Sequence, residues 1–297
     1  MAGMVGATAY GVYRLVDPPG ESLWKDLSIS HELQWNTVWY FESRSSQRLL
    51  VGKPTADAAR LNWSGTPGIQ VRFATQPLLR LGTEFLFDYA QSDESLVFTH
   101  TTGFATNPTI AFAENTATTE RSTSLTVGQF NFLVREEPFT FAFAGLRWWH
   151  QEDQLVLNVL PNGAQWKNIA SSDVPFLQLG GQYGAIGTRW MWINRLGVGV
   201  GPSRNRSSTT VSHIVGTSIP ISVTETDFAA LIDMKTEFAV AVTRQWSMRL
   251  GAQLLGVSGR MRSAEQIEGT DLTNNTTHLN RESVLLSGLF AGFSFQF

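Results

Sequence analysis

Apolar and polar residues alternate with a period of two in most of the chain after residue 31. The clearest case is 79–91, where the odd positions are mostly apolar and Arg80, Glu84 and Asp88 take even positions. The segment 226–242 repeats the pattern. This alternation is typical of β-strands that have one apolar face, whereas an amphipathic helix has a period of 3.6 residues. The sequence therefore predicts an all-β protein, and about ten such segments can be counted.

The connections between these segments are alternately short and long. The short ones lie at 75–77, 135–138, 185–187 and 243–245, and the long polar ones at 43–66, 92–121, 153–173, 201–225 and 259–282. Short turns at one end and long loops at the other are characteristic of membrane barrels. We therefore predict a closed antiparallel up-and-down transmembrane β-barrel of about ten strands, with five long outer loops.

Two segments leave room for alternatives. Residues 1–27 are not assigned to any of the segments, and residues 1–13 lack the basic start and the full apolar stretch of a signal peptide. They are expected to form a periplasmic or plug segment ahead of a barrel over 28–297, or to add two strands for a total of twelve. In 139–152, phenylalanines take odd positions but Leu146 and Trp148 take even ones. A β-bulge near Ala144–Gly145 would reconcile the two faces.

The chain ends on an apolar strand in which Phe293, Phe295 and Phe297 occupy every second position. An aromatic residue at the terminal carboxylate resembles the C-terminal insertion signal of bacterial outer-membrane barrels. That resemblance implies insertion by the barrel assembly machinery, outer-membrane lipid as surroundings, and the cell outer membrane as the location. Both termini would then be periplasmic.

The polar faces of the segments carry both signs of charge. If the apolar faces meet lipid, these side chains line the lumen, and burial requires that they be paired or hydrated. The lumen of a ten-stranded barrel is narrow. We therefore expect an ion-paired lumen lined by Arg72, Arg80, Glu84, Asp88, Arg147, Arg189, Arg195, Asp233, Lys235, Glu237 and Arg249.

Composition narrows the function. Charged residues make up 16% of the chain and the net charge is −3, so nucleic acid is not an expected partner. The chain has no cysteine, and its five histidines lack metal-ligand spacing. No run of about 18 apolar residues predicts a transmembrane helix. From these features we expect no metal, no cofactor and no enzymatic activity. A lipase on the outer face is also excluded at this stage, because outward positions are apolar.

Several short motifs resemble a known family. They are 68–73 followed by 79–85, then 144–152, 180–184 and 243–251. In this order they resemble the hairpins of the porin-like outer-membrane β-barrel family abundant in planctomycetes. The resemblance implies a porin-like or structural barrel and no assigned substrate.

Three functions remain open. The first is limited permeation through a narrow lumen. The second is a scaffold for adhesion or partner binding, in which long loops, notably 92–121 and 259–282, contact a surface partner. The third is a hydrolase carried by the loops, which requires an acid and a histidine converging at one rim.

Overall fold

The computed structural model describes most of the chain after residue 30. The described residues are 31–43, 47–52, 58–61, 65–75, 81–99, 104–106, 110–112, 116–137, 140–160, 164–212, 218–261, 270–271, 276–277, 279 and 281–297. The predicted segment 1–27 lies outside them. No helix in the described part of the chain is long and apolar enough to cross a membrane.

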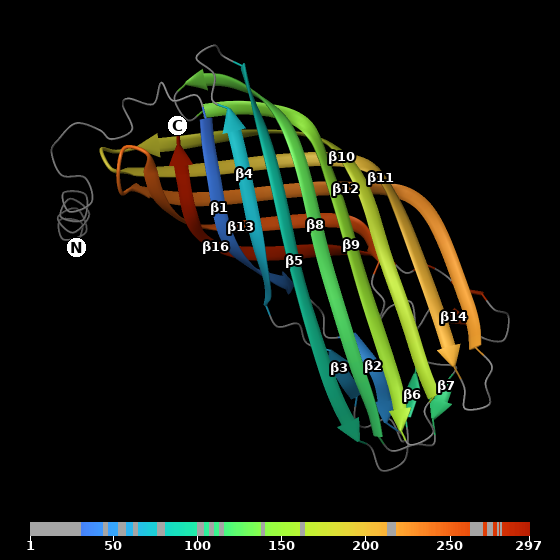
Figure 1. Ribbon diagram of the computed structural model, residues 1–297. Coiled ribbons are helices and arrows are strands. Elements are labelled where there is room, and N and C mark those ends of the chain that lie inside the picture. The colour runs from blue at the N-terminus through green and yellow to red at the C-terminus, as the bar shows by residue number, and fades with distance from the viewer. Residues whose placement is uncertain are drawn as a thin grey trace, which may run out of the picture.

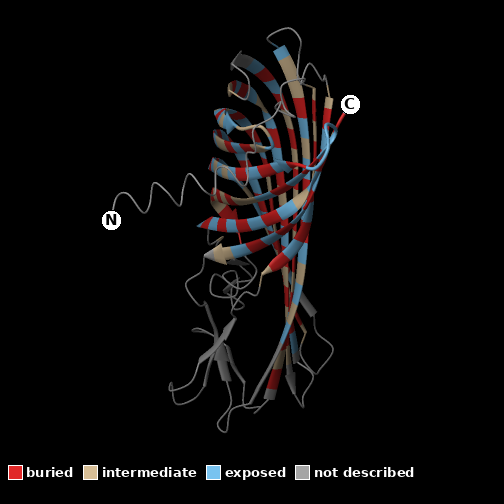
Figure 2. Cartoon of the chain, turned by 90° about the vertical axis from the view of Figure 1, so that its left-hand side faces the viewer, coloured by how far each residue is buried: buried red, intermediate tan, exposed pale blue. Residues whose placement is uncertain are grey.

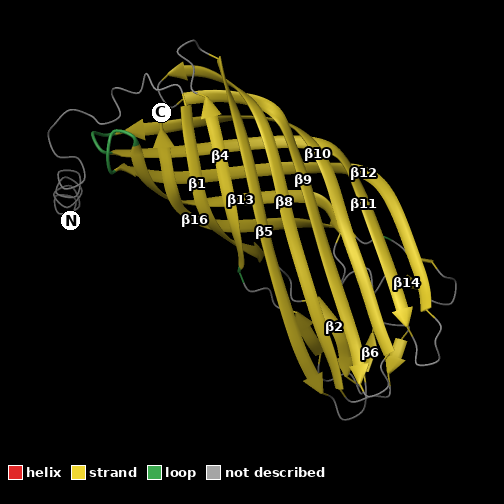
Figure 3. Cartoon of the chain, viewed as in Figure 1, coloured by secondary structure: helices red, strands yellow, loops and turns green. Residues whose placement is uncertain are grey.

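The described chain forms a closed antiparallel barrel of ten strands (Figures 1 and 3). Its strands are β1 (His31–Ser43), β4 (Thr66–Thr75), β5 (Leu81–Thr99), β8 (Thr116–Glu137), β9 (Thr140–Leu160), β10 (Ala164–Ile186), β11 (Trp190–Ser212), β12 (Ser218–Ala241), β13 (Trp246–Met261) and β16 (Arg281–Gln296). The barrel closes because β1 pairs with both β4 and β16. The predicted fold class and the count of ten strands are confirmed.

Six short strands lie outside the barrel wall. A four-stranded sheet has the order β3-β2-β6-β7, and a separate pair is formed by β14 and β15. Their bounds are β2 (Gln47–Gly52), β3 (Ala58–Leu61), β6 (Phe104–Thr106), β7 (Ile110–Phe112), β14 (Thr270–Asp271) and β15 (Thr276–Thr277).

The apolar face of each barrel strand lies on the outside. Phe85, Phe238 and Phe293 are 51%, 41% and 54% exposed, whereas their chain neighbours Glu84 and Glu237 are buried. Figure 2 shows this alternation of exposed and buried residues along the strands. Backbone groups in hydrocarbon need partners within the protein, and a closed barrel supplies them. The exterior is therefore that of a membrane-spanning barrel.

The barrel wall is much taller on one side. Strands β8 to β12 have 21 to 24 residues, whereas β1 has 13 and β4 has 10. Figure 1 shows the long strands running well past the short ones, at the end away from the C-terminus.

This tall wall corrects the predicted long loops. Segments 153–173 and 201–225 are strand for most of their length, with continuous pairing such as Asn168 to Leu155 and Thr209 to Ile221. Segment 92–121 is strand at both ends, up to Thr99 and from Thr116. The prediction failed because a strand beyond the bilayer has no lipid-facing side. Its backbone ladder continues, but the apolar alternation stops.

The predicted bulge in β9 is also wrong. The pairing of β9 with β10 runs without a register shift from Val159 to Phe141. Phe141 and Phe143 are buried, and Leu146 is 60% exposed. Both phenylalanines face the lumen at the end of the strand that lies near the short turns. There the Arg195 guanidinium lies over the Phe143 ring, 4.1 Å from its centroid. The end of the barrel with the short turns thus has an aromatic interior.

Candidate functional site: the barrel interior

The side chains inside the barrel are organised around Glu84, which has no exposed surface. Its carboxylate accepts five hydrogen bonds. Arg72 Nε donates at 2.6 Å, and Arg195 donates through Nη1 at 2.7 Å and Nη2 at 2.6 Å. Asn131 and Gln129 donate at 2.8 and 3.2 Å. The contact with Arg195 crosses the lumen from β5 to β11, so Glu84 links walls that are distant in the sequence.

A second cluster lies around Arg249. Its guanidinium is hydrogen-bonded to both Glu32 and Glu237. Lys235 Nζ lies 3.3 Å from Glu237, and Arg72 Nη1 lies 3.0 Å from Glu32. Because Arg72 also contacts Glu84, the two clusters form one network across the barrel. Acids and bases alternate along it, so that no described charge faces only a like charge.

A third pair completes this ionic layer. Arg147 Nη1 donates to Asp233 at 2.6 Å, and Gln253 donates to the same carboxylate at 2.9 Å. The cavity among these groups has a volume of about 30 Å³. That volume is enough for about one water molecule. We refer to these charged residues together as the ionic layer.

The structure brings together nine of the eleven residues predicted to line the lumen. They are Arg72, Glu84, Asp88, Arg147, Arg195, Asp233, Lys235, Glu237 and Arg249, each linked inside the barrel by the contacts described here. Arg80 lies outside the described residues. Arg189 does not belong to the set, because β11 begins at Trp190 and Arg189 is exposed in the preceding turn. The apolar–polar alternation in the sequence continues one residue beyond the end of the strand.

Uncharged side chains that the sequence analysis missed connect the charged ones. Gln70 accepts from Asn36 and from Lys235, both at 3.1 Å, and Tyr40 donates to Asp88. Gln178 donates to Asn131 at 2.7 Å. All these amide residues occupy the same alternate, inward-facing strand positions as the charged residues. This spacing is the signal in the sequence that could have identified them.

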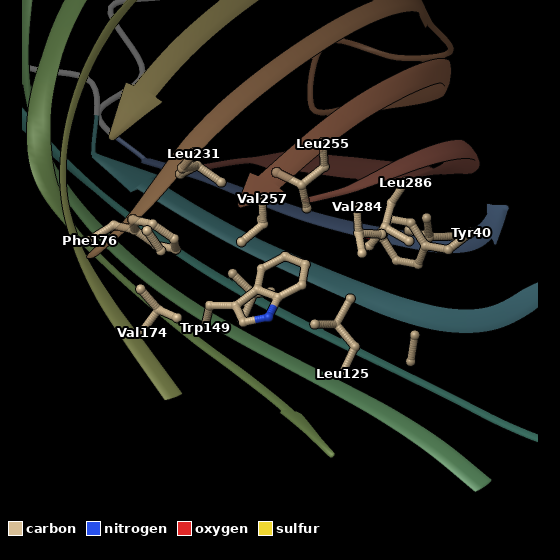
Figure 4. Packing of buried hydrophobic residues seen from close by; sticks show 14 of the residues in the cluster. Tyr40, Leu125, Trp149, Val174, Phe176, Leu231, Leu255, Val257, Val284 and Leu286 are labelled. Carbon is tan, nitrogen blue, oxygen red and sulfur yellow. The ribbon is translucent and has the colours of Figure 1, made fainter. Parts of the chain in front are cut away.

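An apolar layer closes the lumen above the ionic layer, on the side of the tall wall. Trp149, Phe176 and Leu255 are almost completely buried. Figure 4 shows these side chains pointing toward one another from several strands, together with Tyr40, Leu125, Val174, Leu231, Val257, Val284 and Leu286. Trp149 lies two residues after Arg147, so one inward face changes from ionic to apolar within a single strand. Period-two alternation alone does not reveal this change.

Further along the tall wall, the inward face becomes polar again. Arg121 contacts Asp153 through Nε at 2.7 Å and Nη2 at 2.9 Å, and Thr123 donates to the same carboxylate at 2.8 Å. This bidentate geometry is the strongest form of a carboxylate pair. From the short turns toward the top of the tall wall, the interior is thus aromatic, then ionic, then apolar, then polar.

The outer surface of the tall wall also carries polar chemistry. His150 Nδ1 lies 2.7 Å from Asp173 Oδ1, and the imidazole stacks on Trp148 at 5.7 Å. Thr126 is the cross-strand partner of His150. The exclusion of a lipase on the outer face rests on the premise that outward positions are apolar only. That premise was wrong, because these residues follow directly after the apolar part of their strands.

The last strand lies against both of its neighbours. Phe293 and Phe297 are exposed, and Phe295 packs on Trp246 with ring centroids 4.8 Å apart. The backbone N–H of Phe297 donates to the carbonyl of His31.

Within the described residues, no group of three His, Cys, Asp or Glu side chains has the geometry of a metal site.

Comparison with known proteins finds similar barrels, and the similarity to OmpT supports the fold. Among solved structures, the chain is similar to the outer membrane protease OmpT from Escherichia coli, with a TM-score of 0.53 and 12% identity over 91% of this chain and 96% of that chain. The translocator domain of the autotransporter NalP from Neisseria meningitidis has a TM-score of 0.46 and 9% identity, over 100% of this chain and 95% of that chain. No family model and no curated protein matches the sequence.

The comparison with OmpT corrects the expectation that the chain is not an enzyme. A barrel of this fold carries a protease, so neither the fold nor the scattered histidines justify that exclusion. At 12% identity the similarity concerns the fold and does not transfer an activity. With its closed strand order and apolar exterior, the chain has the fold of outer-membrane β-barrel proteins such as OmpT.

Proposed function

We propose that this chain is a non-conducting outer-membrane barrel whose tall wall serves as a binding scaffold outside the cell. The single observation that carries the proposal is the apolar layer lying across the lumen above the ionic layer. A passive channel needs a continuous wet path, and an apolar constriction of this kind excludes water. The proposal therefore favours the structural and scaffold alternatives over permeation.

The height of the wall supports the scaffold role. A strand needs roughly 9–11 residues to cross a bilayer. Strands β10, β11 and β12 have 23, 23 and 24 residues, so about half of each extends beyond the lipid. We place this wall outside the cell, because the short turn at 187–189 marks the periplasmic end. Insertion into the membrane would depend on the barrel assembly machinery, which would recognise the last strand. Membership of the porin-like barrel family abundant in planctomycetes stays a prediction.

Conductance in planar bilayers tests the proposal. The wild-type protein is expected to give no stepwise current, even though insertion is verified by its shift in gel mobility on heating. Replacing Trp149 and Phe176 together by alanine is expected to open small current steps, because it removes two aromatic rings from the apolar layer. Trp148→Ala, on the lipid side, is the matched control and should remain silent. Ohmic steps from the wild type would refute the proposal.

A second candidate is hydrolysis at the outer wall, favoured by the contact between His150 and Asp173. A carboxylate that orients a histidine is the usual arrangement of a general base. Purified barrel in micelles would be assayed with fluorogenic peptide and ester substrates. Turnover that is lost in both His150→Gln and Asp173→Asn would support this candidate. Equal turnover in the wild type and both variants would exclude the pair.

A further inference from the structure

The outward face of β11 changes abruptly from apolar to cationic. Val198 and Val200 are 42% and 58% exposed, and Pro202 follows on the same face. The next two outward residues are Arg204 and Arg206, and both are exposed. No other pair of neighbouring outward positions in the described barrel strands carries two arginines.

The depth of the two arginines follows from the strand geometry. From Trp190 to Pro202, β11 rises about 40 Å along its own axis, at about 3.4 Å per residue. With a strand tilt of about 40°, this corresponds to about 30 Å across the membrane, which matches the hydrocarbon thickness. Arg204 then lies about 5 Å beyond the hydrocarbon, at the level of the lipid headgroups.

Both guanidinium groups are available to a ligand. Neither makes an ion pair or hydrogen bond with any residue that the structure describes. The nearest outward carboxylate is Asp173, the cross-strand partner of Arg204, and it contacts His150 instead. Glu225 pairs in register with Asn205, so its side chain belongs to the inward face of the wall.

Hydroxyl groups and an apolar surface surround the arginines. Arg206 lies between Ser171 and Thr224 in the cross-strand register, and Arg204 lies beside Thr226. Directly below, Phe228 is the cross-strand partner of Pro202 and is 76% exposed. Guanidinium and hydroxyl donors therefore lie immediately above a surface that suits acyl chains.

We propose that Arg204 and Arg206 bind the phosphate group of an outer-leaflet lipid, whose acyl chains lie on Val200, Pro202 and Phe228. Guanidinium groups bind phosphate oxygens through paired N–H donors. The term "outer leaflet" rests on the membrane orientation given under the proposed function, but the binding itself does not. At a similar height, two outward side chains on other strands are acidic, namely Asp93 on β5 and Glu152 on β9. The proposed site is therefore restricted to the wall around β11.

Because the chain has no cysteine, a single fluorescent label can be placed beside the site. Ser222→Cys on β12 is exposed near Arg206, and Ser95→Cys on β5 is an exposed position on a different strand. The labelled protein is reconstituted in phosphatidylcholine nanodiscs with a trace of phosphatidic acid carrying an acceptor dye in its acyl chain. Energy transfer is compared with that from phosphatidylcholine carrying the same dye.

We expect phosphatidic acid to be enriched at the Ser222 label by about fivefold for each arginine, and not at the Ser95 label. Arg204→Gln with Arg206→Gln should abolish the enrichment, whereas Lys at both positions should retain part of it. Arg189→Gln, which removes an exposed arginine at the opposite end of the barrel, should leave it unchanged.

Two outcomes would overturn the proposal. One is equal energy transfer from both lipids at the Ser222 label in the wild type. The other is complete loss of the enrichment in millimolar inorganic phosphate, because the site would then bind free anions rather than a lipid. Neither outcome bears on conductance, so this test and that of the proposed function fail independently.

Discussion

Replacing Glu84 by glutamine should destabilise the barrel more than any other isosteric change in the ionic layer. The carboxylate is completely buried and accepts hydrogen bonds from two guanidinium groups and two amides. Glutamine has almost the same shape but no charge, and its own NH₂ would face donors. Each charge-assisted hydrogen bond contributes about 1.5–3 kcal/mol, and breaking a buried pair costs about 3–5 kcal/mol. We therefore expect the free energy of unfolding to fall by about 3–5 kcal/mol.

The assay is reversible unfolding in guanidinium chloride with the barrel in detergent micelles, followed by tryptophan fluorescence. Glu152→Gln, an exposed carboxylate on the outer wall, is the control and should change the free energy by less than about 0.5 kcal/mol. Replacing Glu84 and Arg195 together by leucine should recover part of the loss, because Arg195 is no longer left as an unpaired buried charge, while Arg72 keeps Glu32 as a partner. A loss below about 1 kcal/mol for Glu84→Gln would refute the reasoning.

Three further predictions concern other parts of the barrel. Asp153→Asn should lower the free energy of unfolding by about 2–3 kcal/mol in the same assay, because buried Arg121 loses its charged partner; an unchanged midpoint would contradict the ion pair. Gly145→Ala should reduce the folded fraction on a gel, since its Cβ would lie 2.0 Å from the Phe130 carbonyl, whereas Gly181→Ala, with its nearest contact at 3.6 Å, should fold normally. Phe297→Ser should slow insertion into cell membranes, and wild-type levels of heat-modifiable barrel would argue against a terminal signal.

Much of the fold could be predicted from the sequence, because lipid imposes one apolar face on every strand. That rule alone predicts that Glu84, Lys235 and Arg249 lie on the inward face of their strands. Above the lipid, the rule no longer applies, so the sequence pattern predicts loops at 153–173 and 201–225 where the structure has strand extensions. Hydrogen bonding between backbones, which continues there, leaves no periodic signal in the sequence.

The candidate site was predictable only as a set of inward charges. Which acid meets which base depends on the stagger of the strands around the barrel, as the contact between Glu84 on β5 and Arg195 on β11 shows. The apolar layer was missed because Trp149 shares its face with Arg147. The pair of His150 and Asp173 was missed because the two residues lie on different strands, and the sequence does not define which residues of the two strands lie side by side.

The central claim is that lipid covers the outside of the barrel and that the ionic layer is sealed inside it. Nitroxide labels at successive single cysteines along 232–238 of β12 would test this claim most directly in a bilayer. The account predicts that oxygen collides readily with labels at Ile232, Met234, Thr236 and Phe238, and that labels at Asp233, Lys235 and Glu237 are shielded from both oxygen and water-soluble nickel chelate. Oxygen accessibility at the odd rather than the even positions would contradict the account, and so would nickel accessibility at the odd positions.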